Sequence, residues 1–142
     1  MPSINPYLNF AGNTEDALKF YQSVFGGDLN IVRFSDTPHG DNVPPIVRDK
    51  VMHGSLTIGQ NNYLMATDAC EEMGFHVNQG NNHYIMIGPD SREQADQLFN
   101  ALAEGGKVNM PLQDMFWGDY YGDLTDKVGI QWMVNYGKPK EK

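Results

Sequence analysis

The stretch from Phe116 to Gly137, FWGDYYGDLTDKVGIQWMVNYG, joins an aromatic, glycine-rich segment to one in which apolar and polar residues alternate. The apolar side chains of the second segment share one face of an extended chain, at Ile130, Trp132, Val134 and Tyr136. The other face carries Gln131, Met133 and Asn135. This period of two predicts a strand with one face on a core and the other free for water or a ligand.

The length and composition describe one domain spanning residues 1–142. The chain is 40% hydrophobic and 20% charged, an ordinary globular mixture with enough apolar material for a core. A formal net charge of −8 argues against nucleic acid or an anionic membrane as partner, because both bind clustered cations. No apolar run reaches the ~20 residues of a membrane helix. The first residues also lack a signal-peptide pattern, so we expect a cytoplasmic protein.

Two segments predict amphipathic helices of similar design. The first, NTEDALKFYQSVFGG, starts with Asn13 as a candidate N-cap, and its apolar stripe consists of Ala17, Phe20, Tyr21 and Val24. The second, SREQADQLFNALAEGG, starts with Ser91 and Gln94 at capping-box spacing, and its stripe consists of Ala95, Leu98, Phe99 and Leu102. A shift of 78 residues, from Ala17 to Ala95, superposes the two stripes and predicts an internal duplication.

Strand-like runs surround each helix in the same order. SINPYLNF and NNHYIMI precede the helices, and the runs that follow them are 28–35, 51–59 and 62–67 in the first half and 107–112, FWGDYYGDL and 129–136 in the second. The sequence therefore predicts an α+β fold of two βαβββ repeats, about 1–68 and 81–137. Helices are expected outside curved mixed sheets that form a cleft. The Pro-rich loop 35–50 is predicted to lack regular structure.

Alternation assigns strand residues to the helix side or to the cleft side. The helix side of the first strand is predicted to carry Ile4, Leu8 and Phe10. The cleft side of 51–59 is predicted to carry Val51, His53, Ser55 and Thr57. The shift of 78 residues makes His83, Ile85 and Ile87 the cleft-side counterparts of Asn5, Tyr7 and Asn9.

Three stretches carry a family resemblance: INPYLNFAGNTEDALKFYQSVFGG, VMHGSLTIGQNNYLMATD and FWGDYYGDLTDKVGIQWMVN. In their order, and in the final pattern of FWG, YG, TD and G-x-x-W, the chain resembles the PhnB-like proteins of the vicinal oxygen chelate superfamily. This superfamily includes glyoxalase I, bleomycin resistance proteins and extradiol dioxygenases. The resemblance implies paired βαβββ units and a ligand cleft, and we expect a homodimer.

In metal-using members of this superfamily, the first and last strands of each unit supply inward-facing ligands for a divalent ion. By resemblance these positions fall on Asn5, Met65, His83 and Gln131, and a shift of one residue would replace Met65 by Leu64 or Ala66. The set lacks the carboxylate or thiolate that zinc, nickel and iron sites favour beside imidazole. We therefore expect no metal cofactor. If a metal binds, its candidate ligands are His83, Gln131 and Asn5.

The other cleft candidates are aromatic or polar: Tyr7, His53, Trp117 and Tyr121. Each also has a structural interpretation, as a hydrogen-bonded histidine or a packed aromatic. The favoured hypothesis is a small-molecule ligand in a polar and aromatic cleft without a tight metal site. The alternatives are a divalent-metal-dependent lyase, isomerase or dioxygenase using His83, and a non-catalytic interaction module. No Gly-rich nucleotide-binding turn follows a strand.

Overall fold

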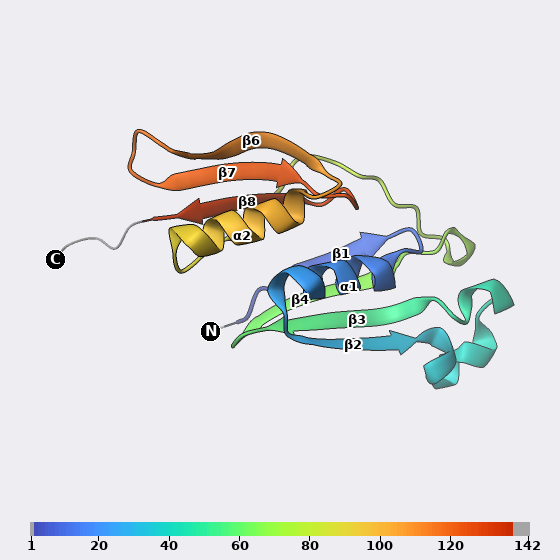
Figure 1. The fold of residues 1–142 in the computed structure, drawn as a ribbon. Helices are drawn as coiled ribbons and strands as arrows, with labels where there is room; N and C mark the ends of the chain where they lie inside the picture. Colours follow the sequence, from blue (N-terminus) through green and yellow to red (C-terminus); the bar gives the residue numbers. More distant parts are fainter. Residues whose placement is uncertain (1, 138–142) are drawn as a thin grey trace. The chain divides into compact units, whose positions relative to one another are not determined.

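The computed structural model describes residues 2–137 and divides into two compact units, unit 1 (Met1–Asn78) and unit 2 (Gln79–Lys142). Each unit has one α-helix on one four-stranded sheet (Figure 1). Both units follow the order βαβββ, which confirms the predicted α+β fold class. No helix within residues 2–137 is long and apolar enough to cross a membrane.

Unit 1 consists of β1 (Tyr7–Phe10), α1 (Thr14–Phe25), β2 (Asp28–Arg33), β3 (Val51–Ile58) and β4 (Asn62–Asp68). Its sheet has the order β1-β4-β3-β2, with β1 parallel to β4 and the other neighbours antiparallel. The loop predicted to be irregular instead forms three short 3-10 helices, Phe34–Asp36, Pro38–Asn42 and Pro45–Val47. Proline begins two of them, where its fixed φ and missing N–H are tolerated. A fourth, Glu71–Met73, follows β4.

Unit 2 consists of β5 (Ile85–Ile87), α2 (Arg92–Ala103), β6 (Lys107–Asp114), β7 (Tyr120–Thr125) and β8 (Gln131–Tyr136). Its sheet order is β5-β8-β7-β6, and β5 is parallel to β8. The topology of unit 1 therefore recurs, as an internal duplication predicts.

Each helix packs on its sheet above a glycine. In unit 1, a Cβ added to Gly54 would lie 2.5 Å from Leu18 Cδ1 of α1. In unit 2, a Cβ on Gly122 would lie 2.9 Å from Phe99 Cε2 of α2. Leu18 was missing from the predicted apolar stripe, yet it is fully buried. The missing side chain on the strand makes room for it.

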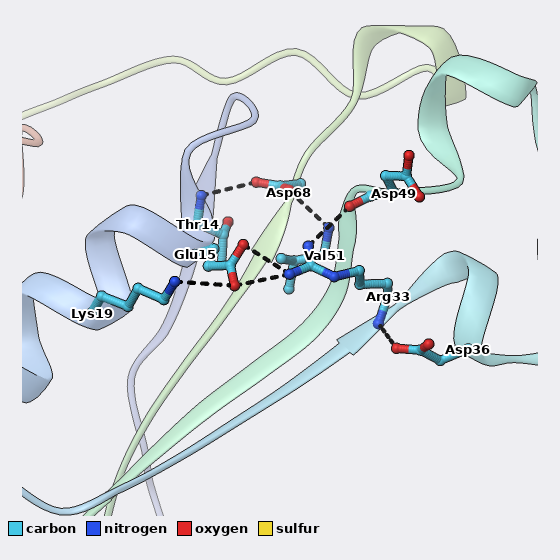
Figure 2. A network of polar contacts seen from close by, with 8 residues as sticks. All are labelled: Thr14, Glu15, Lys19, Arg33, Asp36, Asp49, Val51 and Asp68. Atoms are coloured by element: carbon cyan, nitrogen blue, oxygen red, sulfur yellow. Dashed lines mark hydrogen bonds and ion pairs between the residues drawn. The ribbon is translucent and has the colours of Figure 1, made fainter.

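The start of α1 is held by a residue from the far end of the unit (Figure 2). Asp68, at the end of β4 and 6% exposed, accepts hydrogen bonds from the backbone N–H of Thr14 (3.0 Å) and of Val51 (2.8 Å). Asn13 occupies the predicted N-cap position, but its side chain makes no capping bond. Its φ of −114° and ψ of 24° lie outside the extended region that a capping residue adopts.

An ion pair links the same helix to β2 (Figure 2). Arg33 Nη2 lies 2.8 Å from both carboxylate oxygens of Glu15, and Arg33 Nη1 donates to the carbonyl of Asp49 at 3.1 Å. The hydrogen bond from Arg33 lowers the pKa of Glu15 below its usual value. The end of β2, the start of α1 and the loop before β3 are thereby tied together.

The start of α2 is capped locally. Ser91 Oγ accepts from the Gln94 N–H (3.1 Å), as the capping-box spacing predicted. In the returning bond, Gln94 Oε1 accepts from the N–H of Asp90 (2.6 Å), one residue before the cap. Arg92 then pairs with Asp114 of β6 at 2.6 Å.

Asp126 organises the turn between β7 and β8. Its buried carboxylate accepts from the N–H of Val128 and of Ile130, each at 3.0 Å, and from Trp132 Nε1 at 2.8 Å. The turn thus sets the register of β8. Trp132 and Val134 are buried on the helix side, and the predicted alternation in this strand is confirmed.

Candidate functional site

Each sheet has one face that carries no helix of its own unit. The helix-free face of unit 1 is formed at its centre by Tyr7, Asn30, His53, Ser55, Met65 and Thr67. Met65 pairs with Tyr7 and Ser55, whereas Leu64 and Ala66 are buried on the helix side. Of Leu64, Met65 and Ala66, the strand register therefore puts only Met65 on the helix-free face.

Tyr7 and His53 contact each other on this face. Tyr7 Oη lies 3.1 Å from His53 Nδ1, and the ring centroids are 5.7 Å apart at an interplanar angle of 35°. Tyr7 lies on β1 and His53 on β3, so the contact passes over β4 beside Met65. Tyr7 is 46% exposed. The pair presents an aromatic ring and an imidazole edge on the sheet surface.

A β-bulge in β3 determines where His53 points. Val32 pairs with His53, but the next residue of β2, Arg33, pairs with Val51, so Met52 is the extra residue. Thr67 Oγ1 donates to the carbonyl of Met52 at 2.7 Å. The bulge keeps His53 on the helix-free face and turns Val51 into the core, against its predicted cleft-side position.

The helix-free face of unit 2 is formed at its centre by Tyr84, Met86, Tyr121, Asp123, Gln131 and Met133. Tyr121 Oη donates to Asp123 Oδ2 at 2.9 Å. Burial, this hydrogen bond, the negative charge of Asp123 and the neighbouring Tyr84 together raise the pKa of Tyr121 to about 12. The hydroxyl therefore stays protonated, and acts as a donor, throughout the neutral range.

Two further predicted residues meet at the start of β5. Gln131 Nε2 donates to the backbone carbonyl of His83 at 2.7 Å, which ties the segment before β5 to β8. The His83 ring is exposed, with Nδ1 3.5 Å from Asn82 Oδ1. Gln131 thus uses its amide nitrogen on the backbone of His83 and not on its imidazole.

Ile85 and Ile87 lie on the helix side, against prediction. They pair with the buried Trp132 and Val134. The connection between first strand and helix is 11–13 in unit 1 but 88–91 in unit 2. This extra residue means that the shift of 78 that aligns the helices cannot also align the strands. Tyr84, and not Ile85, therefore shares the face that Tyr7 occupies in unit 1.

The remaining residues singled out from the sequence lie outside the strands. Ile4, predicted to face the helix, is 93% exposed, because β1 begins only at Tyr7; Asn5 is half-buried in the same leading segment. Trp117 lies in the turn between β6 and β7, 52% exposed, in an edge-to-face contact with Phe116 at 4.9 Å.

The donor chemistry does not fit the metal that this fold often carries. Among the side chains that the structure describes, no three from His, Cys, Asp or Glu lie close enough together to hold an ion. The candidate ligands His83, Gln131 and Asn5 supply one imidazole and two neutral amides. Such a set is a poor match for zinc, nickel or iron.

Asp123 and Tyr84 were not singled out from the sequence. The available signal was the alternation of Tyr121, Asp123 and Thr125, which places an acidic residue on the same side of β7 as a candidate tyrosine. Its burial depends on neighbours from other strands.

The chain is similar to several bacterial proteins along nearly its whole length. Protein YjdN of Escherichia coli (strain K12) is 28% identical over 144 residues, 95% of each chain. Protein PA1353 from Pseudomonas aeruginosa is 38% identical in sequence. Its crystal structure matches this chain with a TM-score of 0.85, over 98% of this chain and 100% of that one. A putative 3-demethylubiquinone-9 3-methyltransferase, PhnB protein, from Bacillus cereus is 24% identical with a TM-score of 0.73, covering 96% and 100%.

Solved structures of glyoxalase-related and glyoxalase/bleomycin resistance protein/dioxygenase family proteins share the fold at 14% and 18% identity, a likeness that concerns the fold alone. The family model described as 3-demethylubiquinone-9 3-methyltransferase matches residues 2–135. The chain therefore belongs to the family described as 3-demethylubiquinone-9 3-methyltransferase, and it shares the fold of the glyoxalase/bleomycin resistance/dioxygenase proteins.

Proposed function

We propose that the chain is a cytoplasmic protein that binds a small organic molecule on its helix-free sheet faces, without a tight metal site. The Tyr7–His53 contact carries this proposal. A half-exposed tyrosine that is hydrogen-bonded across a neighbouring strand has already lost much of its rotamer freedom. A ligand that binds there pays less ordering entropy.

The chemistry of the pair suits a planar ligand with a hydrogen-bond acceptor. With a neutral imidazole, Tyr7 donates to His53 Nδ1 and the ring hydrogen lies on Nε2. That N–H is then a donor for a ligand, beside the face of the tyrosine ring. Met65, between the two strands, adds an adaptable apolar surface.

Two catalytic alternatives, a metal-dependent enzyme and a methyltransferase, are supported by no observation as direct as the Tyr7–His53 contact. A metal-dependent lyase, isomerase or dioxygenase would depend on His83, whose ring is exposed and, among the described residues, is hydrogen-bonded only to the Asn82 side chain. The family description names a methyltransferase. The two strand–helix connections contain one glycine each, Gly12 and Gly88, and no Gly-rich turn. We therefore restrict the proposal to binding and include a methyl donor among the test compounds.

The test is a compound screen followed by NMR on the full chain, with signals of the histidine and tyrosine rings as reporters. A true ligand should shift the signals of Tyr7 and His53 and raise the melting temperature with concentration. His53→Ala should remove both effects. His76→Ala is the matched control, since His76 is exposed and contacts Glu71 away from the sheet.

The proposal fails if no compound moves signals on either helix-free face, or if His53→Ala and His76→Ala weaken binding equally. Elemental analysis of protein purified without chelator provides a second readout. A stoichiometric transition metal would favour the metal-dependent alternative.

A homodimer is the assembly we propose for this binding protein. Each sheet ends in two edge strands, β1 and β2 in unit 1 and β5 and β6 in unit 2. Edge strands expose backbone groups that a symmetric partner can pair. Light scattering should give twice the 15.9 kDa of one chain, and the mass of a single chain would contradict the dimer.

A further inference from the structure

Asp123 is a carboxylate buried on a sheet face that carries no helix. It pairs with Met133 of β8 and with Met110 of β6, and Met133 pairs in turn with Met86 of β5. One row across the four strands therefore contains three thioethers and one carboxylate. Asp123 is 9% exposed, whereas Met86, at the end of the row, is 63% exposed. The row thus runs from a buried charge to an accessible apolar edge.

Only one oxygen of this carboxylate has a partner. Tyr121 Oη donates to Oδ2 at 2.9 Å. Among the described residues, Oδ1 accepts no hydrogen bond, and no Lys, Arg or His side chain forms an ion pair with Asp123. Oδ1 is not fully buried and keeps some solvent-accessible surface, so a ligand can reach it. Oδ1 is therefore a hydrogen-bond acceptor without a partner among the described residues, and it lies between Met133 and Met110 in the row.

The other two buried carboxylates differ in this respect. Asp68 binds two backbone N–H groups, and Asp126 binds two backbone N–H groups and the Trp132 indole. The burial of both carboxylates is explained by the backbone N–H groups that they bind. Asp123 has one neutral donor and no counter-ion, and burying a charge in that state costs free energy. Unlike the other two carboxylates, Asp123 accepts no backbone hydrogen bond among the described residues.

The surroundings of Asp123 select among the cations that could bind it. A hard divalent ion needs several oxygen ligands, and no group of three acidic, His or Cys side chains in the described part of the chain supplies them. An organic ammonium ion suits these surroundings better. Its charge is attracted by aromatic rings, and its carbon-bound hydrogens can pack on the polarisable thioethers. An anion would be opposed both by Asp123 and by the net charge of −8.

We propose that the helix-free face of unit 2 binds the ammonium group of a small organic amine, with Asp123 as its counter-ion and the methionine row as its apolar wall. The inference rests on the proposed function and names a ligand class for one of the two faces. Tyr121 acts as a positioning residue, because its hydrogen bond to Oδ2 holds the carboxylate with Oδ1 free.

The experiment uses the full chain with isotope-labelled methionine methyl groups and three probes of similar shape. These are phenethylammonium, phenethyl alcohol and phenylacetate. Phenethylammonium should shift the methyl signals of Met86, Met110 and Met133 in a saturable manner, and added salt should weaken it. Phenylacetate should leave these signals in place. The methyl signal of Met73, an exposed methionine in the 3-10 helix after β4, is the internal control.

Asp123→Asn keeps the shape of the side chain and removes its charge. It should weaken phenethylammonium binding by about tenfold or more, as expected for the loss of a charged hydrogen bond. The matched control is Glu93→Gln, which removes one negative charge from the exposed first turn of α2. It should leave the affinity within about twofold, since an exposed distant charge is largely screened.

Three results would overturn the inference: equal binding of the alcohol and the ammonium probe, an unchanged affinity in Asp123→Asn, or no movement of the three methyl signals at about 10 mM probe. Should Asp123→Asn fail to fold, the ranking of the probes on the wild-type chain decides alone. If other compounds shift signals on either face while phenethylammonium does not, the ammonium site is wrong and the binding proposal stands. If no compound shifts either face, both are wrong.

Discussion

The two units solve the same structural problem in different ways at the start of their helices. The first N–H of α1 binds Asp68, a residue 54 positions away at the end of β4. The start of α2 is capped by Ser91 and Gln94 from its own first turn. Asp68 pairs with the last residue of β1, and the residue that pairs with the last residue of β5 is Val134. The same sheet position therefore holds a capping carboxylate in unit 1 and a valine in unit 2. The valine is possible because α2 is capped by residues of its own first turn.

The ion pairs between helix and sheet show a second difference. In unit 1 the acid, Glu15, lies on the helix and the base, Arg33, ends β2. In unit 2 the base, Arg92, starts the helix and the acid, Asp114, ends β6. An acidic first turn complements the helix dipole, whereas Arg92 opposes it. Both units keep an ion pair between helix and sheet, but the acidic and basic partners exchange elements.

The largest expected effect tests the two caps against each other. Asp68→Ala leaves two N–H groups without their partner, so we expect a loss of about 4 kcal/mol, about 2 for each. Ser91→Ala should cost about 1 kcal/mol, as for an ordinary N-cap. Urea unfolding measures both. Asn13→Ala, at a position without a capping bond, is the control and should change little.

Hydrogen exchange localises this effect. Asp68→Ala should reduce protection at the amides of Thr14 and Val51, the two donors to the carboxylate. If Asp68→Ala and Ser91→Ala cost the same, the contrast between a distant and a local cap is wrong.

The next effect compares the glycines beneath the two helices. A Cβ at Gly122 would lie 2.8 Å from the backbone nitrogen of Leu112, which cannot move away easily. At Gly54 it would meet the Cδ1 methyls of Leu18 and Ile31, which can rotate. We expect Gly122→Ala to cost about 2 kcal/mol and Gly54→Ala about 1 kcal/mol, measured by thermal unfolding. The reverse order would show that side-chain crowding outweighs backbone crowding here.

The smallest effect concerns the reversed ion pairs and depends on pH. The hydrogen bond from Arg33 lowers the pKa of Glu15 below its usual 4.5, so the pair stabilises the fold above that pH and loses its contribution as the pH falls. Glu15→Gln should therefore cost less than about 1 kcal/mol at neutral pH, because the pair is partly exposed, and nothing in strong acid.

Asp114→Asn is the matched change in unit 2. Because the side chains of Arg92 and Asp114 are more exposed than those of Arg33 and Glu15, its effect should be smaller still. Denaturant titrations of both variants at neutral and acid pH make the comparison. A cost for Glu15→Gln that grows toward acid would contradict the assigned sign.

Most predictions based on local patterns held, although the side chain of Asn13 makes no capping bond and Leu18 was missing from the predicted stripe. The alternation of Trp132 and Val134, the cap at Ser91 and the order of the elements all follow from side chains close together in sequence. The errors in assigning strand faces arose where a single residue changed the phase of a pattern. The bulge at Met52 turned Val51 inward, and the longer connection before α2 exchanged the faces of β5. Because strand side chains alternate with a period of two, one extra residue reverses every later assignment.

The sequence by itself determined the class of fold, the two repeats and the residues that alternate along each strand. It could do so because helix and strand periods are properties of neighbouring residues. Only the tertiary structure decided that Tyr7 reaches His53, that Asp68 caps α1 and that Asp123 is buried with one oxygen free. Each of these depends on strands that are distant in sequence but adjacent in the sheet. Burial and partnership are set by the register between strands, which periodicity within one strand does not contain.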